Sequence, residues 1–310
     1  MKKTLPVLLC LSVFLTYAQM PNMASGDIDI LTSEFGLVPD LNGTSIETIG
    51  VQGNLMKPIK KGMFGVSIGY KQYKLSYDEM PAVVSLHTYD KFQQIRTNLI
   101  YRRELKNNWG LMLSAGVNLT SNFEDGISTE DLVYTGIAAF TKRWGDWNRN
   151  TTLMFGALYG TQFGEPMVLP MISFSQRLND QFSYSIGLPL TGLFYTIDKM
   201  HSISAYARPE GFFGNNSATV FVSDPGRFVT NSKLQYNIVK TGISYRYRFT
   251  KYLSATLDGG FIPLSTLKIV DEDVNDIYDF DPGSGAYFSV GIRLGMQRPA
   301  TTPKTQESKN

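Results

Sequence analysis

The stretch that decides the fold lies near the C-terminus and reads AYFSVGIRLGMQ, residues 286–297. Every second residue from Ala286 to Leu294 is apolar, and the positions between them hold tyrosine, serine, glycine and Arg293. This alternation predicts a β-strand with one apolar and one polar face. A soluble sheet would bury the apolar face and wet the arginine, whereas a barrel in lipid would turn the apolar face outward and the arginine into the lumen. The rest of the chain decides between them.

The N-terminal segment has the features of a secretion signal. Basic residues, an apolar core and a small-x-small cleavage site follow one another within residues 1–18, which we predict to be a signal peptide. The only cysteine, Cys10, lies inside it, so we expect neither disulfides nor a catalytic cysteine in the mature chain. Removal of Lys2 and Lys3 leaves 27 basic and 27 acidic residues, and this neutral total gives no reason to expect nucleic-acid binding.

Beyond the predicted signal peptide, the chain is dominated by alternating segments. Many run for about ten residues or more, whereas soluble strands average about five or six. About ten residues is the length that a tilted strand needs to cross a bilayer. We predict fourteen strands, or twelve if the short pair containing Pro189 is irregular. The predicted strands are 27–37, 45–56, 63–76, 92–105, 109–120, 131–142, 151–162, 166–178, 181–188, 191–197, 201–213, 232–249, 252–268 and 284–296.

The connections between these strands alternate between short polar turns and longer loops. Short turns on one side and long loops on the other are typical of outer-membrane barrels, whose short turns lie in the periplasm. The long loops also carry much of the acidic charge of the chain. They are residues 78–91, 121–130, 214–231 and 269–283.

These features together predict an all-β protein with one antiparallel transmembrane β-barrel over residues 19–296. The barrel must be closed, because no water satisfies an exposed backbone edge inside a bilayer. An even strand number places both termini in the periplasm, and the expected location is the bacterial outer membrane. Residues 297–310 are polar and contain two prolines, so we expect a disordered periplasmic tail there.

Three segments carry a resemblance to a known family. GVSIGY (65–70), FSVGIRLG (288–295) and YSIGLPLTGLFY (184–195) before the DKM turn (198–200) resemble an uncharacterised family of bacterial outer-membrane β-barrels, a domain-of-unknown-function family. The resemblance implies the fold and the location and brings no catalytic motif. That location implies outer-membrane lipid and lipopolysaccharide as surroundings and the barrel-assembly machinery as a partner during insertion. It leaves the oligomeric state open.

The candidate functional residues are charged side chains that alternation directs into the lumen. Arginines near the periplasmic mouth could select anions, because guanidinium is permanently charged and binds carboxylate or phosphate through two hydrogen bonds. The alternative is that these arginines solvate the interior and pair with carboxylates in the lumen. The predicted charge cluster is Arg96, Arg102, Arg177, Arg246, Arg248, Arg293 and Asp258.

Other residue groups give weaker signals for chemistry. Residues 271–276 begin like a calcium-binding loop, but Asp276 occupies the position of the required glycine and Pro282 that of the closing glutamate. A solvated acidic surface loop is therefore favoured over weak divalent binding. His87 and His201 are predicted on opposite sides of the membrane, so they cannot share a metal. We predict no catalytic, cofactor-binding or metal-binding residues and no enzymatic activity.

These features predict a general class of function and no specific ligand. We expect a porin-like passive channel or a small-solute transport barrel. The alternative is a non-conducting barrel whose acidic loops serve adhesion, surface organisation or partner binding. The three tryptophans, Trp109, Trp144 and Trp147, all fall at short turns, which fits an interfacial aromatic girdle better than sugar stacking inside a pore.

Overall fold

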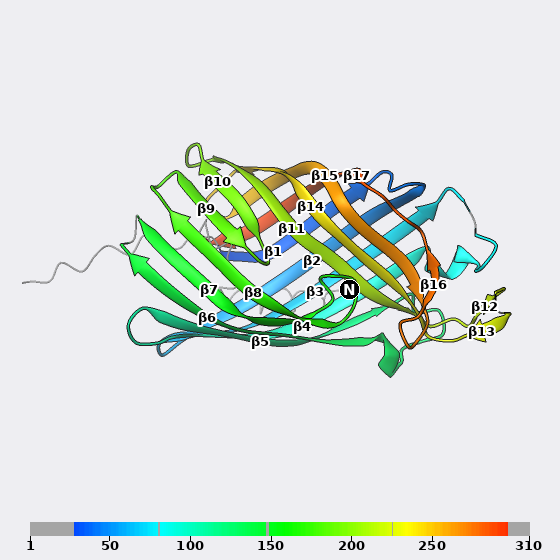
Figure 1. The fold of residues 1–310 in the computed structure, drawn as a ribbon. Helices are drawn as coiled ribbons and strands as arrows, with labels where there is room; N and C mark the ends of the chain where they lie inside the picture. Colours follow the sequence, from blue (N-terminus) through cyan, green and yellow to red (C-terminus); the bar gives the residue numbers. More distant parts are fainter. Residues whose placement is uncertain (1–27, 80, 147–148, 225, 297–310) are drawn as a thin grey trace, which may run out of the picture.

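The computed structural model is a closed antiparallel barrel of fourteen strands (Figure 1). It describes residues 28–79, 81–146, 149–224 and 226–296. Wall strands that follow one another along the chain pair with one another, and the first strand, β1, closes the wall by pairing with the last, β17. The predicted signal peptide, the predicted tail and Trp147 lie outside the described residues.

The wall strands confirm the predicted number and, within a few residues, the predicted positions. Because β9 and β10 are two separate regular strands, the count is fourteen rather than twelve. The wall consists of β1 (Ile28–Val38), β2 (Thr44–Ile59), β3 (Gly62–Tyr77), β4 (Lys91–Glu104), β5 (Trp109–Ser121), β6 (Leu132–Gly145), β7 (Asn150–Gly160), β8 (Met167–Arg177), β9 (Phe182–Gly187), β10 (Thr191–Thr196), β11 (His201–Asn216), β14 (Ser232–Arg248), β15 (Leu253–Val270) and β17 (Gly285–Met296).

The predicted long loops contain short elements of their own. These are the 3-10 helices η1 (Leu86–Tyr89) and η2 (Thr129–Asp131), the hairpin strands β12 (Val220–Val222) and β13 (Arg227–Val229), and β16 (Asp276–Asp279). In Figure 1 this loop end of the barrel is on the right, and the β12–β13 hairpin projects beyond the wall there. Ile28 pairs with Met296 at the opposite, short-turn end.

Alternation along the wall separates an apolar outer face from a largely polar inner face. On β17, Phe288 and Ile292 are 57% and 55% exposed, whereas Tyr287 on the other face is buried. Outward positions on other wall strands are likewise apolar and exposed, as at Leu257 of β15 and Leu55 of β2. An exposed apolar belt of this extent is rare on soluble monomers, and with an even strand number and short turns at one end it is the architecture of an outer-membrane β-barrel. The described residues hold no helix of the length and apolarity needed to span a membrane.

The loop half of the lumen is filled by apolar side chains, which we call the lumen core. Phe212 of β11 stacks on Tyr73 of β3 with ring centroids 4.2 Å apart, although these strands are six pairings apart around the wall in one direction and eight in the other. The lumen core comprises Val38, Leu41, Ile46, Tyr73, Leu75, Val84, Leu86, Tyr89, Phe92, Phe212, Val220, Val222, Val229, Leu234, Tyr236, Ile238, Ile262, Leu267, Ile269 and Tyr287.

A direct contact between opposite walls flattens the barrel at this end. Asn215 of β11 forms a parallel bridge with Ser121 of β5, and the Ser121 hydroxyl donates to the Asn215 carbonyl at 3.0 Å. The Asn215 side chain also donates to the buried Asp131 carboxylate at 2.8 Å. Strands β6 to β10 lie between these two walls, so the barrel is pinched at the loop end.

Candidate functional site in the lumen

The inward residues of β11 follow the lumen from the short-turn end to the loop end. They begin with serines, continue through Tyr206, Arg208 and Glu210, and reach Phe212 of the lumen core. The side chain of Arg208 is 40% exposed, that of Glu210 is 19% exposed and Phe212 is fully buried. Solvent therefore enters the lumen from the short-turn end and is excluded at the lumen core.

A set of ion pairs, which we call the ionic layer, lies directly beneath the lumen core. Glu210 of β11 binds Lys71 Nζ at 2.7 Å and Lys240 Nζ at 2.9 Å. The Arg208 guanidinium lies 3.9 Å from the same carboxylate. Because Lys71 comes from β3 and Lys240 from β14, a single carboxylate joins opposite walls of the barrel. Three cations converge on one anion, and the low exposure of Lys71 and Lys240 strengthens each contact.

Hydrogen-bonded tyrosines line the short-turn side of the ionic layer, and one of them, Tyr287, is a member of the lumen core that lies level with Tyr206. The Tyr287 hydroxyl donates to the Tyr206 hydroxyl at 2.9 Å, and Tyr206 donates to Asp258 at 3.2 Å. The Lys240 ammonium lies 5.1 Å from the centre of the Tyr287 ring, and the Arg208 guanidinium 5.3 Å from that of Tyr206. These cation–π contacts join the tyrosines to the ionic layer.

The register places all seven residues of the predicted charge cluster at inward positions, but it does not gather them into one ring. Arg248 and Arg293 both lie opposite Ser254, and Arg246 lies opposite Thr256 one step further in. These three arginines therefore lie close together on strands β14 and β17, on either side of β15. Asp258 of β15 lies two residues beyond Thr256 on the same face. Arg96 and Arg102 lie on β4 and Arg177 on β8, elsewhere around the wall.

Several of these arginines are held by groups near their own strand ends. Arg177 Nε donates to the Asn179 carbonyl at 3.3 Å, and Arg177 also lies 3.7 Å from the exposed Asp180 carboxylate. Arg248 donates to the Lys199 carbonyl at 3.0 Å. Such contacts hold each guanidinium at the barrel wall.

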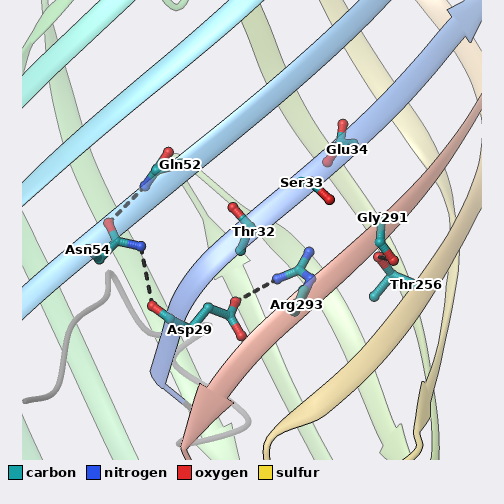
Figure 2. A pocket seen from close by; sticks show the side chains of 9 residues that line it. All are labelled: Asp29, Thr32, Ser33, Glu34, Gln52, Asn54, Thr256, Gly291 and Arg293. Atoms are coloured by element: carbon teal, nitrogen blue, oxygen red, sulfur yellow. Dashed lines mark hydrogen bonds and ion pairs between the residues drawn. The ribbon is translucent and has the colours of Figure 1, made fainter. Parts of the chain in front are cut away.

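Arg293 belongs to a polar pocket in the wall between β1, β2 and β17 (Figure 2). Its Nη1 donates to Asp29 Oδ2 at 3.0 Å. Asn54 donates to the Asp29 carbonyl at 3.2 Å and accepts from Gln52 at 3.0 Å. This wall pocket encloses about 190 Å³, and Thr32, Glu34, Thr256 and Gly291 also line it.

Two glycines make room for a carboxylate in the wall pocket. Glu34 lies opposite Gly291 on one side and opposite Gly50 on the other. A Cβ at Gly291 would lie 3.0 Å from the Thr256 hydroxyl, and a Cβ at Gly50 would lie 3.7 Å from the Lys71 side chain, so the two glycines leave room for these groups beside Glu34. The wall pocket thus combines a paired arginine, a carboxylate, amides and hydroxyls, a set that can bind a small polar solute by hydrogen bonds.

Sequence reasoning missed Asp29 and the ionic layer for different reasons. A β-bulge between Asp29 and Leu31 shifts the alternation, so Asp29 faces inward where strict alternation places it outward. Lys71 and Glu210 already occupy inward positions by alternation, and that signal was present in the sequence. Their pairing across the lumen is a contact between distant strands that local pattern does not specify.

The two histidines lie at opposite ends of the barrel, as predicted. His87 is in η1 at the loop end, and His201 begins β11 at the short-turn end, where its Nδ1 lies 2.6 Å from the Tyr245 hydroxyl. Among the described residues, no three His, Cys, Asp or Glu side chains come together in a way that could hold a metal ion.

The acidic loop after β15 is more ordered than the expected solvated loop. Asp271 is only 8% exposed, and its carboxylate accepts from the Asn275 backbone at 2.9 Å and from Arg227 of the β12–β13 hairpin at 2.9 Å. Lys268 binds Asp276 at 2.7 Å. Burial alone would raise the pKa of Asp271, but the hydrogen bonds from Asn275 and Arg227 outweigh it and lower the pKa.

Acidification is expected to loosen this loop. Because the folded pKa of Asp271 lies below the ordinary value of 3.8, its stabilising contribution is complete above that value and is lost as the pH falls through the folded pKa. Hydrogen exchange of residues 271–279, corrected for the intrinsic rate, should stay constant from neutral pH to about pH 5 and accelerate below pH 3.8. Asp271→Asn should exchange severalfold faster at neutral pH. Equal exchange in both proteins at every pH would contradict this role of Asp271.

The chain matches one protein family and is similar to several solved barrels. A family model, DUF6268, described as a domain of unknown function, matches residues 57–295. No significant match occurs among curated proteins. The KdgM porin in complex with disordered oligogalacturonate is 7% identical, with a TM-score of 0.37 over 85% of this chain and 98% of the porin.

Two further solved structures have a similar degree of likeness. The Pseudomonas putida toluene transporter TodX is 10% identical, with a TM-score of 0.39 over 87% of this chain and 89% of TodX. Outer membrane phospholipase A from Escherichia coli is 12% identical, with a TM-score of 0.37 over 91% of this chain and 95% of the phospholipase. Values this low carry no argument about what the chain binds or does.

Proposed function

The chain belongs to the DUF6268 family, a domain of unknown function, and on that premise we propose that it is a non-enzymatic outer-membrane barrel whose lumen is closed at the loop end. The observation that carries this proposal is the lumen core, in which Phe212 and Tyr73 from opposite walls are in ring contact. The ionic layer around Glu210 adds a second cross-lumen contact directly beneath it. A barrel filled in this way does not offer solutes a continuous aqueous path.

The proposed orientation puts the short turns and both termini in the periplasm and the loop end outside the cell. Trp109 and Trp144 at the short-turn end fit the inner of the two aromatic girdles. The loop end would then face lipopolysaccharide and the cell exterior, and the barrel-assembly machinery would insert the chain. The ordered acidic loop and the projecting β12–β13 hairpin favour the loop end as the surface for adhesion or partner binding.

A second candidate function is the transport of a small polar solute. The wall pocket beside Arg293 favours it, because it offers charged and hydrogen-bonding groups to the solvated half of the lumen. Transport would require the lumen core to move apart, so the closed structure would represent one state of a gated barrel rather than an open pore.

Single-channel conductance distinguishes the closed barrel from a permanent pore. Purified protein, shown to be folded by heat-modifiable gel mobility, should give no steady current in a planar bilayer. Liposomes containing the folded protein should likewise remain unswollen in small sugars. Discrete, long-lived current steps from the folded protein would contradict closure and restore the passive channel. Brief, infrequent openings that increase with an added solute would identify the gated transport barrel.

A further inference from the structure

A second cavity lies on the outside of the barrel at the short-turn end, away from the lumen site. It encloses about 240 Å³ between the ends of β6, β7 and β8. Trp144 lies opposite Thr151, and Thr151 lies opposite Gln176, so the three form a row across these strands. The exposed Phe140 and Phe174 occupy the same face of β6 and β8. The row therefore belongs to the outward face of the barrel, at the edge of the apolar belt nearest the short-turn end.

Two arginines complete this outer notch. Arg149, just before β7, lines it together with Leu178. Arg177 has an inward position by register, but it is the last residue of β8 and lines the outer notch from the rim. Arg149 is exposed. The carboxylate of Asp180 lies 3.7 Å from Arg177 but is largely in solvent, and such exposed pairs are weak. Among the residues that the structure describes, no acidic side chain lines the outer notch, so the described lining presents a positive surface.

Hydrogen-bond donors in the outer notch match an anion with several oxygens. The Tyr184 hydroxyl donates to Gln176 Oε1 at 2.7 Å, which leaves the amide NH₂ of Gln176 as a donor. The Thr151 hydroxyl can donate as well, and guanidinium groups bind phosphate oxygens in pairs. Trp144 places the outer notch at the level of the lipid headgroups, because tryptophan rings favour the interface between membrane and water.

We propose that the outer notch binds the phosphate of a phospholipid headgroup, with Arg149 as its principal charged contact and Arg177 at its rim. The acyl chains of that lipid would then lie along the apolar belt beside Phe140 and Phe174. This inference rests on the proposed orientation, in which the short-turn end faces the phospholipid leaflet. Juxtamembrane cations contribute to the binding of anionic headgroups in this way.

The test compares bound phospholipid in matched single variants of the full folded protein. Delipidated protein is titrated with phosphatidylglycerol, and native mass spectrometry counts the lipids retained. Arg149→Gln should bind the retained lipid about tenfold more weakly than wild type, since one charge-assisted contact is lost. Arg149→Lys keeps the positive charge but cannot form the paired hydrogen bonds of a guanidinium group. Its affinity for the lipid should therefore lie between those of the wild type and Arg149→Gln. Lys251→Gln is the control, because it removes a short-turn cation from a different turn.

The outcomes separate the lipid from other sources of phosphate. Equal lipid retention in wild type and Arg149→Gln would overturn the proposal. Displacement of the lipid by millimolar inorganic phosphate would overturn the lipid assignment and identify free phosphate as the ligand. Conductance measurements on the same preparations test the proposed closure of the lumen separately. A barrel that does not conduct and retains no lipid would contradict only lipid binding at the outer notch. A barrel that conducts and retains the lipid would contradict only closure of the lumen.

Discussion

Glu210→Ala is expected to destabilise the barrel by about 3 kcal/mol and to make the closed lumen conduct intermittently. Removing one partner of a mostly buried ion pair leaves an uncompensated charge and costs about 3–5 kcal/mol in known cases. Here the loss would leave Lys71 and Lys240 facing each other from opposite walls without the anion between them. We choose the lower figure because Glu210 keeps some contact with lumen solvent. Mutual repulsion between the two lysines would then push β3 and β14 apart.

The measurement pairs the urea midpoint of unfolding, read by heat-modifiable mobility, with planar-bilayer recordings. Glu47→Ala is the matched control, because Glu47 of β2 contacts Lys74 of β3 at 3.9 Å in an exposed ion pair. Exposed pairs contribute about 0–1 kcal/mol, so this control should remain silent and nearly as stable as wild type. An unchanged midpoint and silent recordings for Glu210→Ala would show that the ionic layer does not hold the walls together.

Phe212→Ala should have the largest effect on stability of any single change in the lumen core. Phe212 is fully buried, and its ring contacts Tyr73, Phe92 and Tyr236 at centroid distances of 4.2, 5.7 and 5.6 Å. Truncating a buried phenylalanine costs about 3–5 kcal/mol, through lost burial and the cavity left behind. The urea midpoint should fall accordingly, and the loop end should become more accessible to proteases.

Phe228→Ala provides the comparison for Phe212. Phe228 lies on the β12–β13 hairpin and is 75% exposed, so its truncation should change the free energy of unfolding by about 0.5 kcal/mol or less. A similar midpoint for both variants would mean that the lumen core is too loosely packed to close the barrel. In that case the wall alone, and not the side chains within it, would account for the stability of the protein.

The wall could be read from the sequence because alternation is a local property. A strand such as β17 has an apolar residue at every second position, and this period does not depend on which residues lie across the lumen. The fourteen strands and their inward and outward faces therefore follow from short stretches of chain. The ends shift by a few residues, as at β2, which continues past the predicted residue 56 to Ile59.

The contents of the lumen were harder to predict because they depend on contacts between strands far apart in the chain. Inward positions such as Phe92, Phe212 and Ile238 are apolar in the sequence, and apolar residues at inward positions indicate that side chains fill the loop half of the lumen. Which wall each side chain reaches depends on how far the barrel is flattened. The arginines illustrate this limit, since their inward direction follows from alternation but their partners, such as Asp29, do not.

The pairing of Arg293 with Asp29 constrains the order in which the protein can fold. These residues are 264 positions apart in the chain, and the strands that carry them form the closing seam of the barrel. Contacts of such long range form late, because the entropy of the intervening chain must be lost first. Every earlier strand can pair with its neighbour as it arrives, but the seam needs both the first and the last strand. Until then two unpaired edges remain, and each must be shielded from the bilayer and from other chains.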